Sequence, residues 1–129
     1  FMPLSKGASG GELSRIMLAV KHILSKHQKL PTIMFDEIDS GVSGEISNKM
    51  ASIMQEMGQY MQVFTITHLP QIAAKGTHHF KVFKEDHGQT TVTQLMKLNA
   101  NERLDEIAQM LGGSEITETA KQHAKQLLN

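Results

Sequence analysis

The chain has 129 residues, a length typical of one domain, with 13 Lys plus Arg, 13 Asp plus Glu and a formal net charge of zero. This balance argues against a free-standing nucleic-acid-binding domain, which normally carries a basic excess, although a local basic patch stays open. The absence of cysteine excludes a disulfide framework and a thiolate zinc site, and no apolar run reaches the ~20 residues of a membrane span. The first residues have no signal-peptide pattern, and we expect the chain to be an excised fragment.

The first predicted element is an amphipathic helix that begins after Ser9. Ser9 and Glu12 have the spacing of a capping box, which accounts for both side chains structurally. Gly10 and Gly11 need another reason, because each glycine costs about 0.5–1 kcal/mol relative to alanine inside a helix. Bare N–H groups at a helix start bind anions, so we favour a phosphate contact here over capping alone. The predicted apolar face consists of Leu13, Ile16, Met17, Val20 and Leu24.

A short strand follows, and it ends in two adjacent acids, Asp36 and Glu37. The apolar run at residues 33–35 has no polar alternation, which is typical of a strand covered on both faces. Ligands bind beyond the carboxyl ends of strands in open α/β sheets. An apolar strand ending in Asp-Glu is the Walker B pattern, in which one acid suits Mg²⁺ and the next polarises a water. Two solvated acids at a strand end are the alternative interpretation.

Ser43 is a candidate cap for the next helix, whose stop is predicted at Gly58. The apolar face of that helix contains Ile46, Met50, Ile53, Met54 and Met57. Residues 60–67 then form a second strand, and this strand–helix–strand order implies a parallel crossover. His68 would therefore lie at the same end of the sheet as the acid pair, and Pro70 would open a short helix over residues 70–75.

The last third predicts a β-hairpin and two helices. The hairpin strands are residues 77–83 and 90–98, around a turn at 85–88. His78 and His79 are neighbours, so in a strand they would point to opposite faces and could not easily chelate one ion. One helix would be capped at Asn99 or Asn101 and the other would begin at residue 114 or 117, both covering the sheet.

Three motifs in this order resemble the C-terminal half of an ABC-type ATPase head. They are Ser9-Gly10-Gly11-Glu12 at a helix start, residues 33–37 at a strand end, and Ile66-Thr67-His68 at the next strand end. The extension Asp36-Glu37-Ile38-Asp39 is closer to the SMC-like group than to transporters. Residues 9–15, 35–44, 66–73 and 103–113 look like RecN-type bacterial DNA repair proteins. The resemblance implies an α/β fold with parallel strands, crossover helices, a β-hairpin and two C-terminal helices.

The resemblance also implies roles for individual residues. Asp36 would hold Mg²⁺, in part through water, and Glu37 would be the base that activates the attacking water. His68 would contact the γ-phosphate of ATP. The signature residues Ser9, Gly10, Gly11 and Glu12 would bind the nucleotide of an opposing head in trans, and Ser40, Gly41 and Ser43 would form the D-loop.

Two residues depart from the usual pattern. Ala8 precedes Ser9 where the signature usually has leucine, and Ser43 stands where most D-loops end in aspartate. No G-x-x-x-x-G-K-[ST] phosphate loop occurs in the sequence. The resemblance therefore implies that residues 1–129 form a single C-terminal lobe lacking Walker A and the coiled coil, inactive alone.

The implied function is ATP binding and hydrolysis in double-strand break repair and recombination, in the cytoplasm and associated with the nucleoid. The implied partners are the Walker A lobe of the same protein, a second head in a homodimer, and DNA handled by the full assembly, with no membrane partner. Three alternatives stay open: the nucleotide-binding domain of a transporter, a non-catalytic interaction module of the same fold, and a soluble α/β domain with coincidental motifs.

Overall fold

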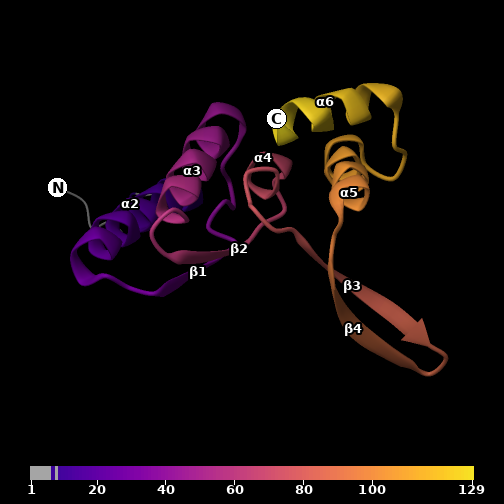
Figure 1. Ribbon diagram of the computed structural model, residues 1–129, viewed down its shortest axis with the longest axis horizontal. Coiled ribbons are helices and arrows are strands. Elements are labelled where there is room, and N and C mark those ends of the chain that lie inside the picture. The colour runs from indigo at the N-terminus through magenta and orange to yellow at the C-terminus, as the bar shows by residue number, and fades with distance from the viewer. Residues whose placement is uncertain (1–6, 8) are drawn as a thin grey trace. The chain divides into compact units, whose positions relative to one another are not determined.

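A computed structural model describes residues 7 and 9–129, and this part of the chain divides into two compact units, the first ending at Lys75 and the second beginning at Gly76. The first unit contains the two strands that are followed by the acid pair and by the histidine. The second unit contains the hairpin and the last two helices (Figure 1). None of the described helices is both long enough and apolar enough to cross a membrane. The residue Ala8, part of the signature pattern, lies outside the described residues.

The first unit is built on two parallel strands. Its elements are α2 (Gly10–Gln28), β1 (Thr32–Asp36), α3 (Gly44–Met57), β2 (Gln62–Ile66) and α4 (Pro70–Ala73). Strands β1 and β2 pair in parallel with Ile33 opposite Val63 and Asp36 opposite Ile66, so the crossover predicted from the strand–helix–strand order is confirmed. Pro70 occupies the first turn of α4, as predicted.

Helix α2 begins where its sequence predicts. Ser9 is the N-cap, its backbone N–H donates to Glu12 Oε2 at 2.6 Å, and its hydroxyl accepts from the Glu12 N–H at 3.4 Å. The predicted capping box is therefore confirmed. The helix ends at Lys29, which adopts a left-handed conformation with φ of 47°.

The predicted apolar face of α2 is not the face that packs in this chain. The buried positions of the helix are Gly11, Leu18 and Ser25, seven residues apart, and Leu18 is only 1% exposed. The five residues of the predicted apolar face are exposed, as is a sixth; they are Leu13, Ile16, Met17, Val20, Ile23 and Leu24. Periodicity identifies an apolar stripe but not the element that covers it.

Strand β1 is covered on one face, not on both as predicted. Ile33 and Phe35 point into the core with Leu18, whereas Met34 on the opposite face is exposed. Phe64, which pairs with Met34, and Ile66 continue this exposed apolar face on β2. The apolar run of β1 is suited to burial on two sides, and this chain supplies helices for one of them.

Helix α3 supplies most of the core, and its predicted apolar face is confirmed. Met50, Met54 and Met57 are buried against the strands, with Ile46 and Ile53 partly buried beside them. Ser43 is the N-cap residue but makes no side-chain cap bond, and the C-cap Gly58 has an ordinary right-handed φ of −62°. The helix therefore stops without the left-handed glycine that its sequence suggested.

The second unit is a hairpin followed by two helices that pack on each other. Its elements are β3 (Phe80–His87), β4 (Thr90–Lys97), α5 (Ala100–Gly112) and α6 (Glu118–Leu128). The hairpin is confirmed, but its turn lies at Gly88 and Gln89 instead of at residues 85–88, with Gly88 at φ of 70°. Glu85 and Asp86 belong to β3, and the positive φ at the first loop position is provided by Gly88.

Local signals placed the last two helices correctly. Asn99 caps α5 in a capping box with Glu102, and Thr117 caps α6 by accepting from the Ala120 N–H at 3.1 Å. An ion pair between Lys81 and Glu106 joins the hairpin to α5. The pKa of the half-buried His79 is lowered, mainly by burial and secondly by the positive charge of Arg103. Both effects favour the neutral imidazole.

The packing of α2 gives a direct test. We expect Leu18→Ala to lower the free energy of unfolding by about 3 kcal/mol, because it leaves a cavity in the core. Met17→Ala, at the neighbouring exposed position, should change it by less than about 0.5 kcal/mol. Urea denaturation of the 129-residue chain would measure both, and equal losses would contradict the observed orientation of the helix.

Candidate functional site

The candidate site lies at the carboxyl ends of β1 and β2. Asp36 is the last residue of β1 and Glu37 follows it, while Thr67 and His68 follow the last residue of β2. Because Asp36 is opposite Ile66 in the parallel register, the two strands end at the same level. Asp36, Glu37 and His68 are all exposed, so the edge that carries them is accessible to a ligand.

The backbone of Glu37 is unusual. It has a positive φ of 48°, and among the described residues other than glycine only Lys29 shares this feature. Its N–H donates to the Ile66 carbonyl at 2.9 Å, and its carbonyl accepts from the Ser40 hydroxyl at 3.1 Å. A left-handed conformation costs a residue with a Cβ about 1–2 kcal/mol, and such strain gathers at functional sites.

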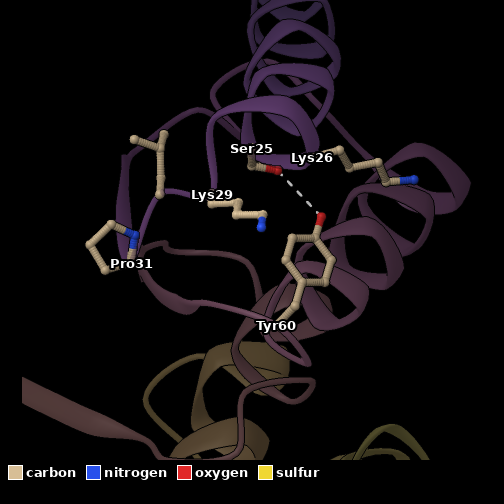
Figure 2. Close-up of a pocket in the computed structure, with 6 residues that line it drawn as sticks. Ser25, Lys26, Lys29, Pro31 and Tyr60 are labelled. Carbon is tan, nitrogen blue, oxygen red and sulfur yellow. Dashed lines mark hydrogen bonds between the residues drawn. The ribbon is translucent and has the colours of Figure 1, made fainter.

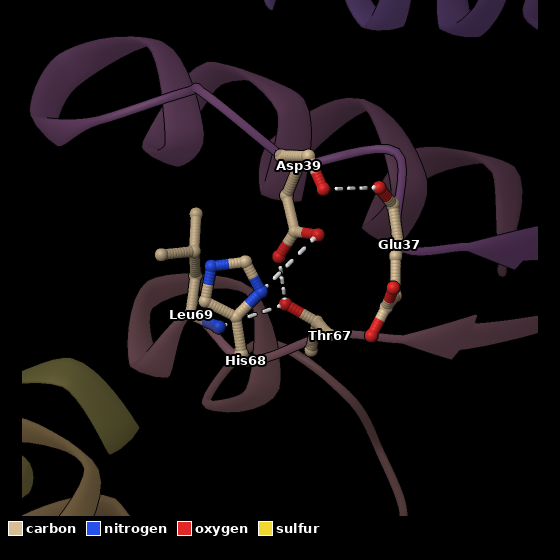
Figure 3. A network of polar contacts seen from close by, with 6 residues as sticks. Glu37, Asp39, Thr67, His68 and Leu69 are labelled. Atoms are coloured by element: carbon tan, nitrogen blue, oxygen red, sulfur yellow. Dashed lines mark hydrogen bonds and ion pairs between the residues drawn. The ribbon is translucent and has the colours of Figure 1, made fainter.

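A buried acid connects the two strand ends (Figure 3). Asp39 is 1% exposed, and its Oδ2 accepts a hydrogen bond from the Thr67 hydroxyl. The same Thr67 oxygen accepts from the Leu69 N–H at 3.0 Å, and His68 Nδ1 lies 3.9 Å from Asp39 Oδ1. Sequence reasoning gave Asp39 no role, since its partners lie 28 residues away in the chain. Its position in an Ile-Asp step just after the strand was the one available signal.

The two glycines at the start of α2 have different surroundings. A Cβ on Gly11 would lie 2.9 Å from the Gly41 carbonyl oxygen, whereas a Cβ on Gly10 would meet nothing within 4 Å. The sequence suggested that the two glycines let a phosphate approach the backbone closely. At Gly11 the group that approaches is part of the chain itself, the loop after β1. Of these two glycines, Gly10 is the one whose surroundings, within the described part of the chain, are open to a ligand.

The remaining predicted residues divide between the site and local structure. The Ser9 N–H that donates to Glu12 lowers the pKa of this carboxyl and keeps its side chain in the capping box. The Ser40 hydroxyl donates to the Glu37 carbonyl, and Gly41, whose φ is 72°, lies against Gly11. Ser43 occupies the N-cap position of α3 without a side-chain cap bond. The predicted D-loop residues thus link the acid end of β1 to the start of α2.

The residues at the strand ends fit Mg²⁺ that is bound together with a phosphate, but they do not fit the ion by itself. Mg²⁺ prefers one or two carboxylates completed by water and phosphate oxygens, and Asp36 offers one exposed carboxylate. In the part of the chain that the structure describes, no group of three His, Asp or Glu could hold a metal alone. The amide at Gly10 opens a helix N-terminus, where anions are favoured.

A hollow lies at the other end of β1, away from the acid pair and His68. It is lined by Ser25, Lys26, Lys29, Leu30, Pro31 and Tyr60. The hydroxyls of Ser25 and Tyr60 lie 3.3 Å apart (Figure 2). Lys26 pairs with Glu56 at 3.6 Å. The hollow adjoins the C-terminus of α2, whose dipole disfavours anions.

No family model matches the chain. Its fold matches a solved SMC ATPase from a study of ATP-driven dimerisation and DNA-stimulated activation, with a TM-score of 0.69 and 20% identity. This match covers 85% of the present chain and 66% of the other. At this identity it shows the fold alone, and it confirms the predicted SMC-like, mixed α/β architecture.

Relatives in sequence narrow the assignment. The DNA repair protein RecN is 46% identical over 125 residues in Bacillus subtilis, 45% over 127 in Halalkalibacterium halodurans and 42% over 126 in Vibrio cholerae. These matches cover 97–98% of the chain but only 22–23% of each relative. The fold is thus that of the solved SMC ATPase. In sequence the chain is similar to RecN proteins, and it spans less than a quarter of the length of those it matches.

The glycine pair gives a test with a built-in control. We expect Gly11→Ala to lower the free energy of unfolding by about 1–3 kcal/mol, because the new methyl group would overlap the Gly41 carbonyl. Gly10→Ala should be neutral or stabilising by up to about 1 kcal/mol. Thermal or urea unfolding of the chain would measure both, and a harmless Gly11→Ala would show that this contact is not tight.

Proposed function

We propose that this chain is the Walker B and signature lobe of the ATPase head of a RecN-type DNA repair protein. The observation that carries the proposal is that two parallel strands end side by side in an acid pair and a histidine, joined through Asp39. The RecN relatives and the SMC-type fold support the same class. Residues 1–129 act in this proposal as one functional lobe, although they fold as two compact units.

Asp36 and Glu37 take the first two roles in hydrolysis. Asp36 would hold Mg²⁺, in part through water, and the ion would supply charge stabilisation to the transferring phosphoryl group. Glu37 would accept a proton from the attacking water as that water's oxygen bonds to the γ-phosphorus. Its clamped left-handed backbone fixes the direction in which this carboxylate leaves the strand end.

His68 would contact the γ-phosphate from the end of β2. Its side chain is 63% exposed, so a ring nitrogen can reach a ligand in front of the strand ends. Hydrolysis removes the phosphate oxygen that this ring would contact. His68 would thereby make the loop before α4 sensitive to whether ATP or ADP is bound.

Ser9, Gly10, Gly11 and Glu12 would serve the nucleotide of a second head. Ser9 and Gly10 are exposed at the start of α2 and would face the γ-phosphate held by the other copy. Gly11 and Glu12 would contribute indirectly, through the Gly41 contact and the capping box. Binding of ATP would then favour the paired heads, and hydrolysis would release them.

The exposed apolar surfaces support a further partner, the Walker A lobe of the same protein. The outer stripe of α2 and the free face of the sheet together leave nine large apolar side chains exposed; they are Leu13, Ile16, Met17, Val20, Ile23, Leu24, Met34, Phe64 and Ile66. Soluble proteins rarely leave such patches uncovered. The missing lobe would cover them and bring the lysine-bearing phosphate loop to the strand ends.

The biological role follows from the relatives, which are named DNA repair proteins. In the full protein, cycles of head pairing would serve double-strand break repair and recombination, with DNA bound by the whole assembly. The full protein would work in the cytoplasm, associated with the nucleoid.

The role of Glu37 is tested by Glu37→Gln in the full-length protein. We expect ATP binding to stay within about twofold and turnover to fall by about 10²–10⁴-fold, because the amide cannot accept the proton. Glu45→Gln is the matched control: it removes an exposed acid paired with Lys49 on α3 and should leave turnover unchanged. Binding by fluorescent nucleotide and phosphate release would be measured, and wild-type turnover in Glu37→Gln would exclude Glu37 as the base.

The partner lobe is tested by mixing. The chain alone should neither bind ATP tightly nor hydrolyse it, and adding the Walker A lobe should restore both. Met17→Asp and Phe64→Asp should weaken association by about 2–4 kcal/mol, since each would bury a charge, while Gln55→Asp on exposed α3 surface should not. Calorimetric titration of one lobe into the other measures this. Tight ATP binding by the chain alone would contradict the split site.

A further inference from the structure

Asp39 has one carboxylate oxygen that is buried and without a hydrogen bond. Its Oδ2 is satisfied by Thr67, but Oδ1 has no hydrogen-bond partner although the residue is only 1% exposed. Burying an ionised carboxylate costs several kcal/mol unless both oxygens are compensated. An acid at this position therefore needs a second partner that the free oxygen can reach.

The ring of His68 forms an ion-pair contact with that oxygen. Its Nδ1 lies 3.9 Å from Asp39 Oδ1, within ion-pair range but too long for a hydrogen bond (Figure 3). The ring faces the buried acid on one side and is otherwise largely open, since 63% of the His68 side chain is exposed. A small rotation of the ring would close the gap and leave Nε2 facing away from the acid.

The backbone around Asp39 makes its position firm. The Asp39 carbonyl accepts from the Val42 N–H at 3.1 Å, and Thr67, which donates to its side chain, also accepts from the Leu69 N–H at 3.0 Å. The carboxylate is thus fixed relative to both loops. The imidazole is the exposed member of the pair.

We propose that Asp39 is a positioning residue for His68: it binds the Nδ1 proton and directs Nε2 toward the substrate phosphate. This inference rests on the proposed function, in which His68 contacts the γ-phosphate. A carboxylate that accepts the Nδ1 hydrogen bond orients the imidazole and turns Nε2 away from the acid, and a ring nitrogen that carries a proton can donate it to a phosphate oxygen. Asp39 itself touches neither nucleotide nor metal ion.

The competing interpretation is that Asp39 only ties the loop after β1 to Thr67. The variant Asp39→Asn separates the two ideas. Its carbonyl oxygen can still accept from the Thr67 hydroxyl, while its amide presents a donor, and no longer an acceptor, to His68 Nδ1. The hydrogen bond between residue 39 and Thr67 is kept, while the group that faces His68 Nδ1 changes from an acceptor to a donor.

The experiment is a double-mutant cycle on the ATPase activity of the full-length protein. We expect Asp39→Asn and His68→Ala each to lower kcat by about 10–100-fold, with KM for ATP within about twofold, and the double variant to lose no more than His68→Ala. Independent, multiplying losses, or a normal kcat in Asp39→Asn, would overturn the proposal. Thr67→Val, which removes the tie and keeps the carboxylate, should cost less than Asp39→Asn.

A measurement on the unmodified protein makes the test independent of whether a variant folds. With ¹⁵N-labelled histidine, and His68 assigned by the signal lost in His68→Gln, Nδ1 should carry a proton at neutral pH. An unprotonated Nδ1 would overturn the proposal. If His68→Ala leaves kcat unchanged, the proposed function of His68 fails; if it lowers kcat while Asp39→Asn does not, only the positioning role fails.

Discussion

The parallel pairing of β1 and β2 is the constraint on which the candidate site depends. Its register sets Asp36 opposite Ile66, and one further bond, from the Glu37 N–H to the Ile66 carbonyl at 2.9 Å, extends the ladder past the strand end. A shift of one residue would turn every side chain of β1 to the other face. Phe35 would then leave the core, and the loop that carries Asp39 would lose its alignment with Thr67.

The core that holds this register is one-sided. Helix α2 contributes Leu18, and α3 contributes its methionines, to the face of the sheet that carries Ile33 and Phe35. The opposite face and the outer stripe of α2 have the composition of a core without its cover. Covering such an apolar surface is favourable by about 25 cal/mol for each Å² removed from water.

Local sequence signals predicted the elements well, because their causes lie within a few residues. The capping boxes at Ser9 and Asn99, and the proline that opens α4, need no tertiary contact to be recognised. The predicted placement of acids and imidazole at one sheet edge also held, since strand order and connection length restrict a crossover to parallel pairing.

What the sequence did not reveal depends on contacts between distant segments. The stripe that contains Met17 is the stronger apolar signal in α2, yet the helix packs through Leu18 and the glycine at position 11. No local pattern encodes which neighbour is present. Asp39 was missed for the same reason: its burial and its bond to Thr67 exist only once both strands have paired.

The glycine at position 11 shows how one contact couples two motifs. A Cβ added to Gly11 would lie nearest to the carbonyl oxygen of Gly41, so position 11 needs a residue without a side chain. Gly41 has a positive φ, a conformation that favours glycine at position 41 as well. The same loop holds Ser40, whose hydroxyl clamps the strained carbonyl of Glu37. The start of α2 and the acid end of β1 therefore meet the same loop, through the approach of Gly11 to Gly41 and through the hydrogen bond from the Ser40 hydroxyl to the Glu37 carbonyl.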